Sequence, residues 1–100
     1  MSYIGIDDRV FDRAFGGRVA TLNREQGSSV RRLAVLARIR PGRLARILAG
    51  KRPASPAEYG RLVQVLGVNK AAFDADVLID AQAAQLVQQA QDARFDEVFG

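Results

Sequence analysis

The sequence predicts an all-α fold, and three observations support this prediction. Apolar residues recur at spacings of three and four along most of the chain, as they do on one face of a helix. Residues that start and stop helices, chiefly aspartate, serine, proline and glycine, separate these periodic stretches. No stretch alternates apolar and polar residues with the period of a half-buried strand. The length of 100 residues and the hydrophobic content of 48% suit one small domain with its own core.

The first expected helix begins near Asp7 or Asp8, either of which can cap it. Its apolar positions share one face: Phe11, Phe15, Val19 and Leu22. Gly16 and Gly17 lie inside this stripe, and each costs about 1 kcal/mol relative to alanine. A kink at the glycines and a second helix starting at Phe15 are therefore both open. Gly27 ends this region.

Two short helices follow. Ser28 or Ser29 can cap the first of them. Its expected inward positions lie within residues 30–37: Val30, Leu33, Ala34 and Ala37. A three-residue connection leads to Pro41, which suits the first helical position because its missing N–H would have no partner there. Gly50 closes the second short helix.

The fourth expected helix has a strong start signal, Ser55-Pro56-Ala57-Glu58. The serine can accept the amide hydrogen bond of the third helical residue, the proline takes the first position, and the glutamate reaches back to the cap. Gly67 is the stop signal. The inward positions of this helix are Tyr59, Leu62, Val63 and Leu66.

A short fifth helix, capped by Asn69, is expected to run through Phe73, and an additional C-terminal helix is expected from about Asp76. Apolar residues of that last helix recur like a coiled-coil seam: Ile79, Ala83, Leu86, Ala90 and Ala93. The seam either packs on its own domain or joins two copies. We therefore expect a domain over residues 1–74 and, over residues 75–100, a helical tail for dimerisation or partner binding.

The composition excludes several classes of function. The chain has no cysteine and no histidine, which removes disulfides, thiol nucleophiles, Cys/His zinc sites and imidazole catalysis. We expect no cofactor, no bound metal and no enzymatic activity. No apolar run approaches the roughly 20 residues that span a bilayer, and no signal-peptide pattern opens the chain. A cytoplasmic protein without a membrane partner is expected.

Three acids in the last third of the chain could be ligands of a bound cation. Asp74, Asp76 and Asp80 lack the glycine and closing glutamate of a calcium loop. We interpret them as helix caps and solubilising charge.

Positive charge is concentrated in the middle of the chain. Residues 28–61 hold nine lysines and arginines against one acid, Glu58, whereas residues 70–100 hold six acids against two basic residues. A cationic block of this kind suits a phosphate polymer or an anionic membrane surface. The membrane reading is weak because the block lacks tryptophan and interleaved aromatic residues. A merely solvated helix face is the alternative.

Two short helices joined by three residues, the second rich in arginine, outline a helix-turn-helix. On a helical projection of residues 41–49, one face is apolar: Leu44, Ile47 and Leu48. The opposite face is basic or small: Gly42, Arg43, Ala45, Arg46 and Ala49. Small side chains allow a helix to approach the floor of a major groove about 12 Å wide.

The stretch from Phe15 to Arg52 resembles the lambda-repressor/Cro-type (C1-type, also called XRE-type) helix-turn-helix family. The matching positions run without a gap: Phe15-Gly16, Arg18, Val19, Leu22, Gly27, Ser29, Leu33-Ala34, Ile39, Leu44, Ile47 and Gly50-Lys51-Arg52. The likeness continues through Leu66-Gly67-Val68. The resemblance implies a five-helix lambda-repressor-like domain, usually dimeric, that binds operator DNA in the major groove; here an additional C-terminal helix follows it.

The resemblance also implies roles for individual positions. It places base contacts at five positions: Arg40, Pro41, Gly42, Arg43 and Arg46. It places phosphate contacts around Ser29 and Val30 and at Lys51 and Arg52. Arginine can give guanine O6 and N7 two parallel hydrogen bonds, so Arg43 and Arg46 are the preferred base readers. The alternative is that both bind phosphates, and Arg40 suits either a phosphate or a base. The basic side chains expected to neutralise phosphates are Arg31, Arg32, Arg38, Lys51 and Arg52.

Two departures from the family pattern concern the turn. Arg38 stands where the family usually has glycine, so a left-handed backbone is expected at an arginine. Arg40 stands where a serine or threonine usually caps the recognition helix, and arginine cannot accept that hydrogen bond.

These observations predict a sequence-preferring transcriptional regulator, a phage or bacterial repressor, with a recognition helix over about residues 41–49. A homodimer would bind two half-sites about 34 Å apart on double-stranded DNA. Two alternatives stay open. One is an architectural DNA-binding protein with low specificity. The other is an antitoxin or adaptor module whose tail binds a protein partner, an idea motivated by the apolar residues Phe95, Val98 and Phe99.

Overall fold

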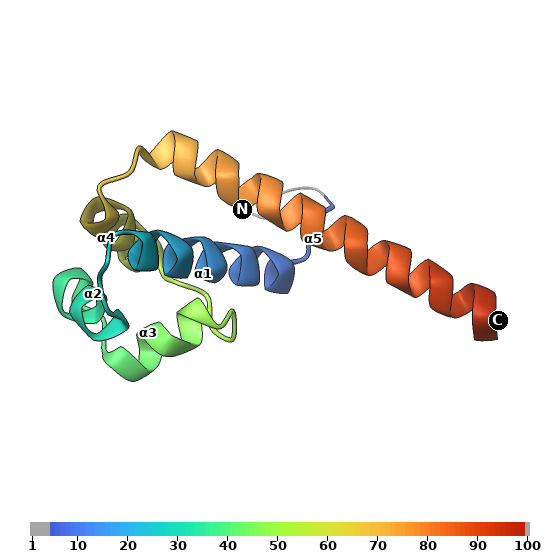
Figure 1. Ribbon diagram of the computed structural model, residues 1–100, viewed down its shortest axis with the longest axis horizontal. Helices are drawn as coiled ribbons and strands as arrows, with labels where there is room; N and C mark the ends of the chain where they lie inside the picture. Colours follow the sequence, from blue (N-terminus) through green and yellow to red (C-terminus); the bar gives the residue numbers. More distant parts are fainter. Residues whose placement is uncertain (1–4, 100) are drawn as a thin grey trace.

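The computed structural model describes the backbone of residues 5–99 and the side chains of residues 5–91. Five helices follow one another: α1 (Asp8–Glu25), α2 (Val30–Ala37), α3 (Pro41–Leu48), α4 (Pro56–Leu66) and α5 (Lys70–Phe99). The described residues contain no strand, so the predicted all-α class is confirmed. In Figure 1, α1 lies in the middle, α2, α3 and α4 gather around one of its ends, and α5 runs along it and projects well past it.

Helix α1 is continuous, and no second helix starts at Phe15. Asp7 is its cap, because the Asp7 carboxylate accepts a hydrogen bond from the Arg9 amide. Gly16 has a packing role: a Cβ atom there would lie 2.3 Å from the Ile47 carbonyl oxygen, far inside contact distance. The glycine therefore lets the backbones of α1 and α3 touch. Gly17, one position on, faces open space.

The turn between α2 and α3 has the expected conformation. The Ser29 hydroxyl accepts a hydrogen bond from the Arg32 amide and caps α2. Arg38 adopts the predicted left-handed backbone, with φ 58° and ψ 43°. Arg40 begins α3 without a side-chain cap, and Pro41 takes the first helical position.

One predicted inward position of α2 is wrong. Val30 is 42% exposed, whereas three others of that face are buried: Leu33, Ala34 and Ala37. Val30 shares their side of the helix but stands at its first position, where α2 has not yet reached the core.

Helix α4 starts and ends as expected. Ser55 and Glu58 form a complete capping box, in which each side chain accepts a hydrogen bond from the other residue's backbone N–H. Gly67 ends the helix in the left-handed conformation. Side chains also join neighbouring helix ends, since Arg61 Nε donates to the Ala37 carbonyl at 2.7 Å and Gln26 Nε2 to the Leu66 carbonyl at 2.7 Å.

Helix α5 corrects the prediction of two separate helices after Gly67. Asn69 does act as a cap, with its side-chain oxygen accepting from the Ala72 amide at 3.0 Å. The helix then continues from Lys70 to Phe99 without a break at Asp76. No glycine or proline occurs between these two ends, so an aspartate resembling a start signal is not enough to end the preceding helix.

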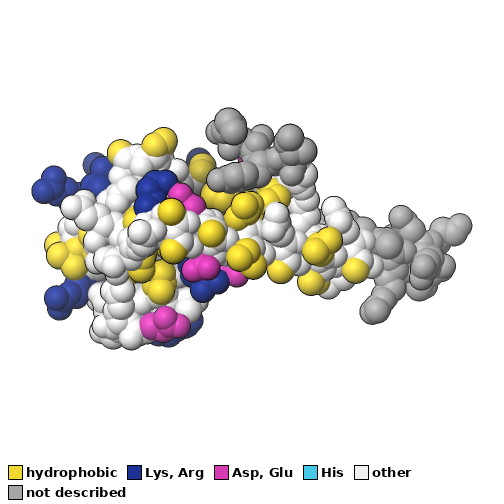
Figure 2. Space-filling view, turned by 90° about the horizontal axis from the view of Figure 1, so that it is seen from above, with side chains coloured by type: hydrophobic (Ala, Val, Ile, Leu, Met, Phe, Trp, Pro, Cys, Tyr) yellow, Lys and Arg dark blue, Asp and Glu magenta, His cyan; other side chains and the backbone are white. Residues whose placement is uncertain are grey.

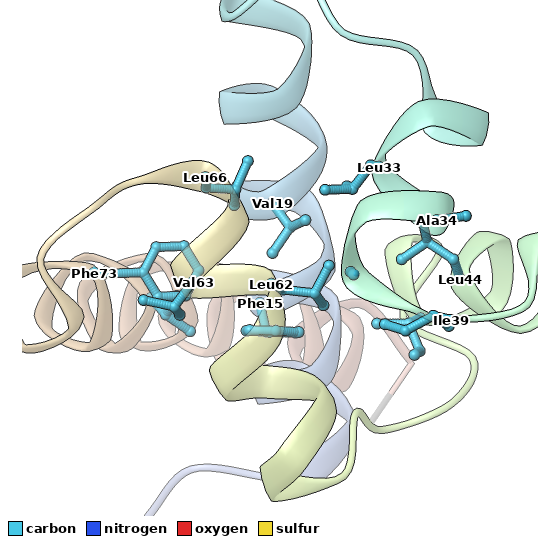
Figure 3. Close-up of a cluster of buried hydrophobic side chains, with 13 residues drawn as sticks. Phe15, Val19, Leu33, Ala34, Ile39, Leu44, Leu62, Val63, Leu66 and Phe73 are labelled. Carbon is cyan, nitrogen blue, oxygen red and sulfur yellow. The ribbon is translucent and has the colours of Figure 1, made fainter.

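A single hydrophobic core joins all five helices. Its buried members are Phe15, Val19, Leu33, Ala34, Ala37, Ile39, Leu44, Ile47, Leu62, Val63, Leu66, Phe73 and Val77. Figure 3 shows Leu33 and Leu44 on one side of α1 and Phe73 on the other. The Phe15 ring stacks on Tyr59 with centroids 4.6 Å apart and meets the Phe73 ring edge-on at 5.8 Å. Aromatic packing thus attaches the first turn of α5 to α1 and α4.

Candidate nucleic-acid interface

Helix α3 is divided into a buried face and an exposed face, as its sequence predicts. Leu44 and Ile47 are fully buried against the core. The exposed side chains of residues 41–49 are Pro41, Gly42, Arg43, Ala45, Arg46 and Ala49. We call this set, together with the exposed Arg40 before it, the α3 surface. It carries cations and small groups and no carboxylate of its own.

All the candidate phosphate contacts are exposed. The set comprises Ser29, Arg31, Arg32, Arg38, Lys51 and Arg52. Within the described part of the chain, none of the five cations in this set has an ion-pair partner. The Ser29 hydroxyl is already used in capping α2, where it accepts from the Arg32 amide at 3.1 Å. These cations, which belong to α2, to the turn after it and to the loop after α3, therefore carry unneutralised charges, which favours an anionic partner.

Among the candidate base contacts, Arg43 differs from the others because it has an intramolecular partner. Its Nε donates to Glu58 Oε2 at 2.7 Å, and its Nη2 donates to Glu58 Oε1 at 2.7 Å. Nη2 also reaches the Pro53 carbonyl at 3.4 Å. Arg40 and Arg46, by contrast, make no side-chain hydrogen bond or ion pair to any residue that the structure describes.

Hydrogen bonding from Arg43 lowers the pKa of the Glu58 carboxyl to about 2, against the opposing effect of burial. The Ser55 backbone and hydroxyl add to this lowering. The same pairing raises the pKa of the Arg43 guanidinium. Sequence reasoning missed this pair. The available signal was that Glu58 is the single acid within the cationic block of residues 28–61.

Of the three acids compared with a cation site, Asp74 and Asp80 bind side chains of the same chain, which corrects their interpretation as caps and solubilising charge. Asp80 accepts two hydrogen bonds from Arg18, at 3.0 and 2.9 Å, and so joins α5 to α1. Asp74 accepts from the Tyr59 hydroxyl and pairs with Lys70 at 2.7 Å. Asp76 is exposed, as a solubilising charge would be. Over the side chains described, no group of three or more potential ligands could hold a metal ion.

The outer face of α5 carries the predicted seam. Its exposed members are Ile79 (61%), Ala83, Leu86 (65%) and Ala90. We call these four residues the α5 stripe. Their side chains are exposed, although α5 itself packs along α1, as the prediction of a helix packed on its own domain requires. Ala93, Phe95, Val98 and Phe99 lie outside the described side chains. Figure 2, seen from the α5 side, shows hydrophobic side chains following this helix. No helix in the described range is both long and apolar enough for a membrane span.

Comparison with known proteins agrees with this geometry. A family model described as a helix-turn-helix domain matches residues 14–75. No curated protein matches the sequence. A crystal structure of the clp gene regulator ClgR from Corynebacterium glutamicum is similar, with 26% identity, a TM-score of 0.66, and coverage of 88% of this chain and 89% of that one. A second ClgR structure gives 27% identity and a TM-score of 0.61, covering 74% and 91%. The chain belongs to the family of helix-turn-helix domains.

Proposed function

We propose that this helix-turn-helix protein binds double-stranded DNA and regulates transcription as a sequence-preferring repressor. One observation carries the proposal: α3 exposes only small, basic and proline side chains while Leu44 and Ile47 are fully buried beneath it. A helix of that form fits a major groove. The similarity to ClgR, a regulator of clp genes, supports a regulatory role. The family and its neighbours favour a binding function over catalysis.

The proposed contacts divide into two classes. The candidates for base contacts are Arg40, Gly42, Arg43 and Arg46, where glycine allows close approach and an arginine without an intramolecular partner offers paired donors to guanine. Phosphate contacts come from the exposed residues around α3: Ser29, Arg31, Arg32, Arg38, Lys51 and Arg52. The second class fixes the register of the protein on the duplex without reading its sequence. Binding should therefore weaken steeply as salt concentration rises.

The α5 stripe supports a homodimer as the active form. Four apolar side chains at coiled-coil spacing stand in solvent, and a second copy would present the same four in return. Two α3 helices would then face half-sites one helical turn apart. Such a protein would act in the cytoplasm, on the nucleoid. The tail of residues 75–100 is the segment through which a protein partner would bind.

Selection from a random duplex library, at two salt concentrations, tests this function. We expect an enriched motif with two-fold symmetry that survives the higher salt. Arg46→Ala should lose preference at one base position in each half-site. Lys70→Ala is the matched control, because it removes one positive charge on α5, on the opposite side of α1 from α3 (Figure 1). It should leave the motif unchanged.

The exposed cations around α3 equally favour a second candidate, an architectural protein that binds DNA with little base preference. Enrichment of base composition alone, with affinity collapsing at the higher salt, would establish that alternative. Binding to no duplex at either salt would contradict both and direct attention to an adaptor role for the tail.

A further inference from the structure

The pair formed by Arg43 and Glu58 connects three parts of the DNA-binding region. Arg43 lies in the first turn of α3, and Glu58 lies in the first turn of α4. Glu58 Oε1 accepts from both Arg43 Nη2, at 2.7 Å, and the Ser55 amide, at 2.9 Å. Arg43 Nη2 also donates to the carbonyl of Pro53, which lies in the loop between α3 and α4. One carboxylate therefore holds the start of α3 to the start of α4.

This pair opposes the use of Arg43 as a base reader. The Glu58 side chain is only 10% exposed, and Arg43 is its ion-pair partner. If a base drew Arg43 away, the Glu58 carboxylate would lose its ion-pair partner, and a buried charge without such a partner is unfavourable. It would also stand near the phosphates of the bound DNA, which carry the same sign of charge. Arg40 and Arg46 face no such competition, because no described carboxylate contacts either of them.

We propose that Glu58 is a specificity-determining residue. By binding Arg43, Glu58 makes that arginine a positioning residue for α3, and base contacts are left to Arg46 and Arg40. This inference rests on the proposed function, since it assigns roles within the same DNA-binding surface. It predicts that the two arginines of α3 behave differently, although both are exposed and lie on the same helix one turn apart.

The first test compares the two arginines by library selection. Arg43→Ala should weaken binding to the selected duplex and to a scrambled duplex by a similar factor, and the preferred base at every position should stay the same. Arg46→Ala should abolish the preference at one position. The proposal is overturned if Arg43→Ala abolishes a base preference that Arg46→Ala leaves intact.

The second test releases Arg43 while keeping the helix cap. In Glu58→Gln the amide oxygen can still accept from Ser55, so the capping box is retained and the charge is removed. The released arginine should add one phosphate contact and raise the salt slope by about one unit. The ratio of selected-site to scrambled-site affinity should fall about tenfold. A ratio that rises would show that Glu58 had been restraining a base reader, and would contradict the proposal.

Two controls separate this inference from a general loss of structure. Ser55→Ala weakens the cap but leaves both Arg43–Glu58 hydrogen bonds in place, so the affinity ratio should not change. A double-mutant cycle on thermal unfolding, using Arg43→Ala, Glu58→Gln and both together, needs no DNA. We expect clear coupling, and additive effects would overturn the positioning role even with DNA binding intact. Failure of the unaltered protein to bind any duplex would instead overturn the proposed function, while the coupling could still be measured.

Discussion

The molecule exposes two surfaces that contrast in chemistry. The α3 surface is basic and small, with the cationic side chains of Arg40, Arg43 and Arg46. The α5 stripe has no charge, and its Ile79 and Leu86 side chains are more than half exposed. The contrast fits the two partners proposed above, a polyanion for the first surface and the same helix of a second copy for the second.

The two surfaces are also supported differently. Helix α3 is pressed onto α1 at Gly16 and buries Leu44 and Ile47, so its position is set by close packing. Helix α5 is anchored mainly along its first part, by the buried residues Phe73, Val77 and Ala81, by the Arg18–Asp80 ion pair and by the hydrogen bond from Tyr59 to Asp74. Farther along, Gln85 Oε1 accepts one hydrogen bond from the Asp7 amide at 2.8 Å. From residue 82 to residue 91, no described side chain is buried. The DNA-binding surface should thus depend on the core, whereas the stripe should depend on what binds it.

The largest effect should come from Gly16→Ala, which disrupts the close packing of α3 on α1. The new Cβ would lie 2.3 Å from the Ile47 carbonyl and 2.6 Å from that of Leu48, both of them backbone atoms that cannot move aside cheaply. We expect a loss of about 3 kcal/mol in the free energy of unfolding, measured by chemical denaturation. Gly17→Ala is the matched control, because nothing lies within 4 Å of its Cβ. It should stabilise α1 by about 0.5–1 kcal/mol, and a similar response from both glycines would contradict this account of the junction.

The next largest effect should come from Leu86→Asp in the α5 stripe. Its side chain is 65% exposed, so stability of the single chain should change by only about 0.5 kcal/mol or less. Dimerisation should be lost, because two charges would face each other across the seam, and affinity for a two-half-site duplex should fall about 100-fold. Sedimentation equilibrium and a DNA titration measure the two outcomes. Gln88→Asp, on another side of the helix, should leave both unchanged. A Leu86→Asp protein with the parent's oligomeric state would exclude the stripe as the interface.

A smaller effect is expected for Arg38→Gly, which should raise stability and lower DNA affinity. Arg38 adopts φ 58°, a conformation that costs a side-chain-bearing residue about 1–2 kcal/mol relative to glycine. The substitution should therefore raise the melting temperature. It also removes one of the cations beside α3, so DNA affinity should fall and the salt slope should decrease by about one unit. Unchanged DNA binding would mean that the Arg38 side chain stays in solvent and does not contact DNA.

The smallest effect should come from pH near neutrality. The pKa of Glu58 is lowered from 4.5 to about 2 in the folded chain. Its contribution to stability is therefore complete above pH 4.5 and is lost as pH falls from there toward 2. The chain has no histidine, the side chain whose ordinary pKa would make stability change with pH near neutrality. Melting temperatures should be nearly constant from pH 6 to 8 and fall below pH 4.5, and Glu58→Gln should reduce that acid loss.

The ends of most helices could be predicted from the sequence because their signals are local. Asp7, Ser29 and Ser55 cap the helices that they precede, and Gly67 ends α4 in the conformation that glycine favours. The left-handed backbone at Arg38 was expected from the family resemblance, because Arg38 stands where the family usually has glycine. In each case, one residue and its immediate neighbours determine the structure.

What could not be predicted depends on residues distant in sequence. The role of Gly16 depends on the Ile47 and Leu48 carbonyls, which the fold brings against it. Arg43 lies 15 residues from Glu58, and nothing in the α3 pattern alone identifies that partner. The continuity of α5 was missed for a different reason, because Asp76 resembles a cap although the sequence around it contains no helix breaker.

Methylation interference on the selected duplex tests the central claim, that the α3 surface enters the major groove, most directly. Methylation of guanine N7 blocks contacts in the major groove, and methylation of adenine N3 blocks contacts in the minor groove. We predict interference at guanine N7 in two half-sites about one helical turn apart, with one guanine per half-site becoming insensitive when Arg46→Ala replaces the parent protein. Interference confined to adenine N3, or absent from guanine N7, would contradict the account.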